Sequence, residues 1–149
     1  MTIVAVSAPT LRATEVLLLS LAADGLNNQQ IGAATGAEPR AVQHAMSYLI
    51  HTLDVDSRPQ AVALAYRKGW LTRVPTRRAF AALTDRQTEI VQMVVDGMGQ
   101  VQIARKLEVG SRTVYDHLER IFARTGARNR SQLIRIAVDT GLAVVRSEP

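Results

Sequence analysis

The sequence predicts an all-α protein built from two similar halves, and three observations carry this prediction. Apolar residues recur at spacings of three and four, which is the period of an amphipathic helix. Neither half contains a useful length of alternating apolar and polar residues, the pattern of a half-buried strand. Residues 11–71 also align without gaps onto residues 83–143, at an offset of 72, and share their apolar pattern. Identical pairs include Asp24/Asp96, Gly25/Gly97, Gln30/Gln102, Ile31/Ile103, Arg40/Arg112 and Arg58/Arg130.

The second half, residues 83–143, divides into four short helices. Each helix is expected to begin at a capping or turn residue and to carry apolar residues along one face. The expected starts are Thr84, where Gln87 completes a capping box, Gly99, Ser111 and Asn129. The expected ends are Gly97, Leu107 and Gly141, and residues 108–110 form a tight turn between the second and third helices.

The first half, residues 11–71, repeats this scheme. Its start signals are Asn27, Pro39 and Ser57, and its stop signals are Gly25 and Gly69. Residues 72–82 contain Pro75 and three arginines and are expected to form a short, solvated, basic linker, with 79–82 also suited to leading helically into the next element. Residues 1–10 are then an N-terminal extension and residues 144–149 a C-terminal tail.

Composition limits the class of protein. Hydrophobic residues make up 47% of the chain and charged residues 21%, values that are ordinary for a globular protein. Cysteine is absent, which excludes disulfides, thiolate metal sites and cysteine nucleophiles. No apolar stretch approaches the length of a membrane span, so we expect a cytoplasmic, nucleoid-associated protein without a membrane partner. The net charge of +5 favours an anionic partner such as nucleic acid.

The second and third expected helices of each half, with the tight turn between them, form a helix-turn-helix. In this arrangement one helix braces the next, and the presented helix fits the major groove of duplex DNA. The second half resembles the LuxR/FixJ-type (GerE-like) helix-turn-helix of bacterial transcription regulators. The residues that carry the resemblance are Leu83-Thr84-Asp85-Arg86-Gln87, Gly97, Ile103-Ala104, Leu107, Ser111-Arg112-Thr113-Val114, His117, Ile121, Arg124, Arg130 and Gly141-Leu142.

The first half resembles the same family more weakly. It retains Leu11, Gly25, Asn28, Ile31, Arg40, Val42, Arg58 and Gly69-Trp70-Leu71. It has Pro39 at the position of Ser111, Ala45 at that of His117 and Thr52 at that of Arg124. The resemblance therefore implies two tandem four-helix helix-turn-helix domains, of which the second is closer to the family pattern.

Candidate DNA contacts follow from the outward face of the presented helix. The resemblance implies that Tyr115, Asp116 and Glu119 face the groove and that Ser111, Thr113, His117 and Arg124 lie nearer the DNA backbone. Arg112 and Arg120 complete the polar face of this helix. The corresponding residues of the first half are Arg40, Gln43, His44 and Ser47. The alternative is a solvated face held by the ion pairs Arg112–Asp116 and Asp116–Arg120.

Charge is distributed unevenly along the chain. The first half holds five basic and five acidic side chains, and the second half holds nine and seven. The linker adds Arg73, Arg77 and Arg78 without an acid. Because phosphate neutralisation supplies much of DNA affinity, we expect the linker and the second half to dominate binding.

The last expected helix of each half has a second apolar stripe that its own core does not need. These stripes are Val62 and Tyr66 in the first half and Ile134 and Val138 in the second. A helix that is apolar on two sides usually has two partners, so we expect the stripes to pair, either within one chain or between two chains of a homodimer. Alternatively, Ile3, Val4, Val6 or Phe80 could cover them.

The sequence offers no sign of catalysis, metal or cofactor. No nucleophile stands with a base and an orienting group, and His44 and His51 lack a carboxylate or thiolate to complete a metal site. We therefore predict a double-stranded DNA-binding transcription regulator of bacterial or phage type that is not an enzyme. The alternative is a helix-turn-helix module that engages RNA polymerase, a sigma factor or another regulator and has little DNA affinity of its own.

Overall fold

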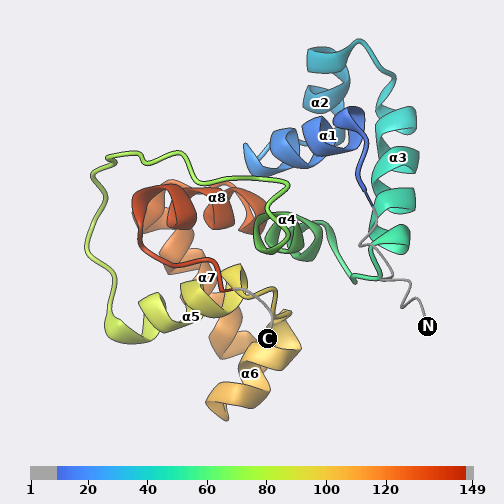
Figure 1. The fold of residues 1–149 in the computed structure, drawn as a ribbon. Helices are drawn as coiled ribbons and strands as arrows, with labels where there is room; N and C mark the ends of the chain where they lie inside the picture. The colour runs from blue at the N-terminus through green and yellow to red at the C-terminus, as the bar shows by residue number, and fades with distance from the viewer. Residues whose placement is uncertain (1–9, 147–149) are drawn as a thin grey trace, which may run out of the picture.

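The computed structural model describes residues 10–146, and these fold into eight α-helices without a strand (Figure 1). The predicted all-α class is confirmed for this part of the chain. The helices are α1 (Ala13–Ala23), α2 (Asn28–Thr35), α3 (Pro39–Thr52), α4 (Arg58–Arg67), α5 (Asp85–Val95), α6 (Gln100–Leu107), α7 (Ser111–Thr125) and α8 (Arg130–Thr140). None of the described helices combines the length and hydropathy that crossing a bilayer requires.

Side-chain caps explain where four of the eight described helices begin. The side chains of Asn27, Ser57, Thr84 and Asn129 each accept a hydrogen bond from the backbone N–H three residues later, as the sequence predicts. The expected cap at Ser111 is wrong, because Gly110 is the N-cap of α7 and Ser111 is its first helical residue. Residues 79–82 are not helical, and α5 begins only at Asp85.

Backbone conformation repeats along the chain at the same offset as the sequence. All four helices of one half begin 72 residues before their counterparts in the other. The eight described residues with positive φ also form four pairs at this offset: Gly25/Gly97, Gly36/Glu108, Asp54/Gly126 and Gly69/Gly141. A left-handed backbone is unfavourable for residues other than glycine. Glu108 and Asp54 nevertheless adopt it at the positions equivalent to Gly36 and Gly126, so both halves require this conformation there.

One continuous apolar core joins the two halves. Helix α4 packs against α8 at the centre of the molecule, α8 also contacts α1, and α4 contacts α5 (Figure 1). The side chains of Val62, Tyr66, Ile134 and Val138 are all buried. The second apolar stripes of these two helices are therefore enclosed within a single chain, and a second chain could reach them only by separating α4 from α8.

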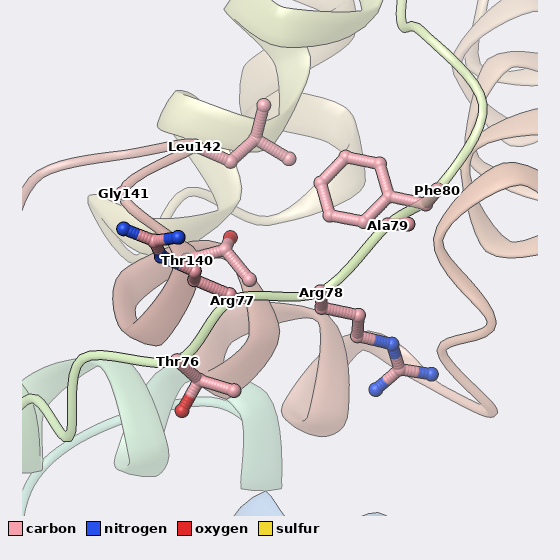
Figure 2. A pocket seen from close by; sticks show the side chains of 8 residues that line it. All are labelled: Thr76, Arg77, Arg78, Ala79, Phe80, Thr140, Gly141 and Leu142. Carbon is pink, nitrogen blue, oxygen red and sulfur yellow. The ribbon is translucent and has the colours of Figure 1, made fainter.

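Of the other residues that were candidates for covering these stripes, the structure describes only Phe80. Phe80 is half-buried and lines a shallow pocket of about 700 Å³ with Gly141 and Leu142 (Figure 2). Ile3, Val4 and Val6 lie outside the described residues.

Polar contacts tie each half to the end of the other half's first helix. The carbonyls of Asp24 and Gly25, after α1, accept hydrogen bonds from Arg128 Nη2 at 3.1 Å and Asn129 Nδ2 at 3.3 Å. The carbonyls of Asp96 and Gly97, after α5, likewise accept from Arg67 Nη1 at 2.7 Å and Gln60 Nε2 at 3.1 Å. Helix C-termini leave carbonyls without partners inside the helix, so these donors satisfy groups that would otherwise need water.

Arg135 of α8 forms a polar cluster that joins the two halves through four hydrogen bonds. Its guanidinium donates to the Ser20 carbonyl at 2.9 Å, to Ser20 Oγ at 3.1 Å, to Asp24 Oδ1 at 2.5 Å and to the Tyr66 hydroxyl at 3.1 Å. Burial raises the pKa of Tyr66, so its hydroxyl stays protonated at neutral pH. Arg135 therefore connects α8 to both α1 and α4.

Residues 72–82 are exposed apart from Phe80, and the segment runs alongside α8 (Figure 1). Its backbone is fixed by Asp139, whose carboxylate accepts from Val74 N at 3.0 Å and whose carbonyl accepts from Thr76 N at 2.9 Å. The linker is thus attached to the helix that it passes.

The Arg135 cluster predicts a measurable loss of stability on truncation. Arg135→Ala should lower the free energy of unfolding by about 1–3 kcal/mol, because Tyr66, Ser20 and Asp24 lose a charged donor. Urea unfolding followed by circular dichroism measures this change. The matched control is Arg86→Ala, which removes a half-exposed pair with Glu89 at 3.8 Å and should cost no more than about 0.5 kcal/mol. Equal losses in the two variants would contradict this role for Arg135.

Candidate nucleic-acid interface

Helices α6 and α7 and the turn between them form a helix-turn-helix. Glu108 ends α6 with a left-handed backbone at φ 57° and ψ 43°, which lets the chain reverse within three residues. Buried Ile103 and Ala104 lie on the inner face of α6, and buried Val114, Leu118 and Ile121 on that of α7. Gln100 of α6 also donates from Nε2 to the Ser111 carbonyl at 2.9 Å. The first helix of the motif therefore braces the start of the second.

The outward face of α7 presents most of the predicted DNA contacts to solvent. Asp116 and His117 are half-buried, and the remaining candidates of the first three turns are exposed: Ser111, Arg112, Thr113, Tyr115, Glu119 and Arg120. No side chain caps the N-terminal end of α7. Its first backbone N–H groups and the positive end of the helix dipole are therefore available to an anion.

Arg112, Tyr115 and Asp116 form a small cluster on this face. Arg112 Nε lies 3.3 Å from Asp116 Oδ1, and the guanidinium carbon lies 5.4 Å from the centre of the Tyr115 ring. The side chain of Arg112 is nevertheless 84% exposed. The pairing offsets part of the acid's repulsion of phosphate and leaves the guanidinium accessible.

Two of the predicted DNA-backbone contacts, Arg124 and His117, are half-buried against the domain. Arg124 Nη1 donates to the Ala82 carbonyl at 2.9 Å and to Gln87 Oε1 at 3.1 Å, so this nitrogen fastens the end of the linker to the capping box of α5. His117 is half-buried, and its Nδ1 atom is shielded from solvent. The nearby domain interior restricts both side chains, which the helical pattern alone did not reveal.

Two structural arginines were missed as such by sequence reasoning. Arg130 Nη2 donates to the Met98 carbonyl at 3.1 Å, and Arg58 donates to the Leu26 carbonyl and to the Asn28 side chain. Burial lowers the pKa of both guanidinium groups. Each arginine joins the start of the last helix in its half to the loop before the helix-turn-helix. The identical pair Arg58/Arg130 was the signal, but identity alone did not distinguish anchoring from DNA contact.

The first half presents an equivalent face on α3. Arg40, Gln43, His44 and Ser47 are all exposed. Although residues 11–71 are neutral as a whole, α3 itself contains no carboxylate, because the five acids lie before it, at its N-cap or after it. The zero net charge of residues 11–71 therefore does not describe α3, which has no acidic side chain.

The linker arginines lie beside the C-terminal ends of helices. Arg73 approaches Gly141 at the end of α8, and Arg78 approaches Gly126 at the end of α7. Figure 2 shows the guanidinium groups of Arg77 and Arg78 extending to opposite sides of the linker. Cations are favoured at helix C-termini by the helix dipole. Arg78 is therefore at the opposite end of α7 from Ser111.

No group of three or more His, Asp and Glu residues within 10–146 is arranged to hold a metal ion. The helix-turn-helix of α6 and α7 presents an exposed, largely polar face to solvent.

Comparison with known proteins places part of the chain in a family. Residues 81–137 match the family described as bacterial regulatory proteins, luxR family (GerE), so this region is a GerE/LuxR-type helix-turn-helix domain. The match begins before α5 and ends within α8.

Similar proteins are transcription regulators by name. The monoamine regulon transcriptional regulator of Klebsiella aerogenes is 44% identical over 54 residues, which cover 36% of this chain and 24% of that protein. The C4-dicarboxylate transport transcriptional regulatory protein DctR of Rhodobacter capsulatus is 26% identical over 80% of this chain and 75% of its own length. A protein of Mycobacterium bovis named "putative HTH-type transcriptional regulator" is 34% identical over 85 residues, which cover 57% of this chain and only 10% of that protein. No solved structure matches this chain.

Arg112 and Arg124 should differ in their effect on stability. Arg124→Ala should lower the free energy of unfolding by about 1–3 kcal/mol, because Gln87 and the Ala82 carbonyl lose a charged donor. Arg112→Ala should change it by no more than about 0.5 kcal/mol, since its side chain projects into solvent. Urea unfolding of the two variants side by side measures the difference. The reverse order would show that Arg112, rather than Arg124, holds the domain together.

Proposed function

We propose that this chain is a double-stranded DNA-binding transcription regulator that inserts α7 into the major groove. The observation that carries the proposal is the N-terminal end of α7, which is uncapped and displays Ser111, Arg112 and Thr113 on a GerE/LuxR-type helix-turn-helix. Free backbone N–H groups and hydroxyls suit phosphate oxygens, and a guanidinium suits the acceptor edge of guanine.

The side chains of the next turn complete this readout. Asp116 and Glu119 can accept hydrogen bonds from the amino group of cytosine, and Tyr115 offers a hydroxyl and an apolar ring. Arg120 is exposed one turn further along and lies where it can balance the two acids. In this proposal the charges of α7 select sequence more than they supply affinity.

We also propose that residues 11–71 form a second, degenerate copy of the same domain and that residues 72–82 link the two copies. The common offset of helix starts and of left-handed residues supports this proposal. The acid-free outward face of α3 supports a DNA contact through Arg40, Gln43, His44 and Ser47. In this proposal the two copies pair within one chain through α4 and α8. This pairing buries the second apolar stripes of both helices, so a homodimer is not needed to cover them.

A second candidate is a protein-interaction module that engages RNA polymerase or another regulator. The observation in its favour is the pair of carboxylates, Asp116 and Glu119, on the face that would otherwise meet a polyanion. Direct binding of duplex DNA by the purified chain separates the two candidates.

The readout proposal predicts opposite effects at two neighbouring positions. Arg112→Ala should weaken binding to a duplex that the chain selects from a random pool by about 1–3 kcal/mol, as loss of a polar DNA contact does. Asp116→Asn should strengthen binding to random duplex, because a repulsion of phosphate is removed. Fluorescence anisotropy at fixed, near-physiological salt measures both. If both variants bound like the native chain, α7 would not be the DNA contact; if the native chain itself bound no duplex, the protein-interaction candidate would be favoured.

The linker arginines should contribute to DNA affinity whatever the base sequence of the duplex. Replacing Arg73, Arg77 and Arg78 by Gln should flatten the slope of log affinity against log salt by up to about 3 units, if each neutralises one phosphate. Sequence preference should persist. A salt series on selected and random duplexes tests both statements, and an unchanged slope would show that these groups serve the helix ends beside them instead.

A further inference from the structure

The contacts between the two halves are reciprocal. Helices α4 and α8 occupy equivalent places in their halves and pack on each other. The contact of α1 with α8 has its counterpart in the contact of α4 with α5. The carbonyls at Asp24 and Gly25 accept from the second half, and those at Asp96 and Gly97 accept from the first. This is the pattern of an isologous, two-fold interface, formed here between two parts of one chain.

A two-fold arrangement gives α3 and α7 equivalent places about one axis. In two-fold helix-turn-helix proteins the protein axis coincides with that of the operator, and each presented helix meets one half-site, with half-site centres about 10–10.5 base pairs apart. When the two presented helices are identical, the operator is a palindrome.

The two presented helices of this chain differ at the positions that would read bases. Both have an exposed arginine as their second residue, Arg40 in α3 and Arg112 in α7. Beyond it, Gln43 stands opposite Tyr115 in the alignment of the halves, His44 opposite Asp116 and Ser47 opposite Glu119. Gln pairs with the adenine edge, and a carboxylate accepts from the cytosine amino group, so the two helices present different hydrogen-bonding patterns.

On the basis of the proposed function, we infer that one chain reads a non-palindromic duplex of two unlike half-sites, one by α3 and one by α7. The backbone symmetry of the halves sets the spacing, and the side chains make the two half-sites different. Because the stripes of α4 and α8 are enclosed within the chain, one chain is enough for a complete site.

Selection of bound duplexes from a random pool with the full chain tests the inference. The expected product is a composite motif of two unlike half-sites whose centres lie about 10 base pairs apart, bound by one chain per duplex. Sedimentation equilibrium of the complex gives the stoichiometry, and footprinting gives the length of the protected duplex.

An exchange of side chains supplies the sharper test. The variant Q43Y/H44D/S47E gives α3 the base-reading residues of α7 at three exposed positions, so the fold has no reason to change. It should bind a palindrome of the α7 half-site at least about tenfold more tightly than the native chain does, because single mismatched base pairs already have effects of this size. The matched control, Y115Q/D116H/E119S, should instead favour a palindrome of the α3 half-site. Circular dichroism checks that both variants are folded.

The outcomes separate this inference from the proposed function. A native chain that selects and protects a single half-site, with no change of preference in Q43Y/H44D/S47E, overturns the inference and leaves DNA binding through α7 intact. A palindromic motif bound by two chains also overturns it. A native chain that binds no duplex at low salt overturns the proposed function and the inference together.

Discussion

The packing of α4 against α8 is the interaction on which the rest of the structure depends. Each of these helices belongs to the core of its own half and carries a second apolar stripe on its other side. Tyr66, the most exposed of the four stripe residues, retains only 5% of its accessible surface. Burying such side chains is the main favourable term available to a chain of this size, so separating the halves would expose apolar surface on both. The two halves therefore hold one another in place.

Hydrogen bonds then fix the orientation of the two halves relative to each other, which apolar packing alone does not specify. Hydrophobic contact is not directional, whereas the carbonyls after α1 and α5 accept hydrogen bonds only from donors that lie in line with them. Glycine is needed at both of these turns, since Gly25 and Gly97 adopt φ values of 82° and 88°. The Asp-Gly sequence that recurs in the two halves thus ends a helix and also places a carbonyl where the opposite half can reach it.

The candidate interface lies away from this junction, on surfaces that the cores support from behind. Val114, Leu118 and Ile121 bury one side of α7 and leave the opposite side to Arg112, Asp116 and their neighbours. Arg124 and Arg130 also contribute to the support, because Arg124 Nη1 and Arg130 Nη2 donate to carbonyls within the domain. A rigid support of this kind lets exposed residues change with little cost to stability, which is consistent with the unlike faces of α3 and α7.

The sequence by itself determined the helices, most of their caps and the helix-turn-helix, because these depend on contacts within a few residues. Asn27, Ser57, Thr84 and Asn129 could be recognised as caps from local pattern, and the exposed side of α7 from its helical period. Ser111 was misplaced by one position because Gly110 can also begin a helix without a side chain. Tertiary structure alone decided which arginines are exposed and which anchor loops. It also decided that the apolar stripes of α4 and α8 are buried within one chain. The roles of the arginines and the burial of the stripes both depend on which residues far apart in sequence become neighbours. A periodic pattern shows only which face of a helix is apolar.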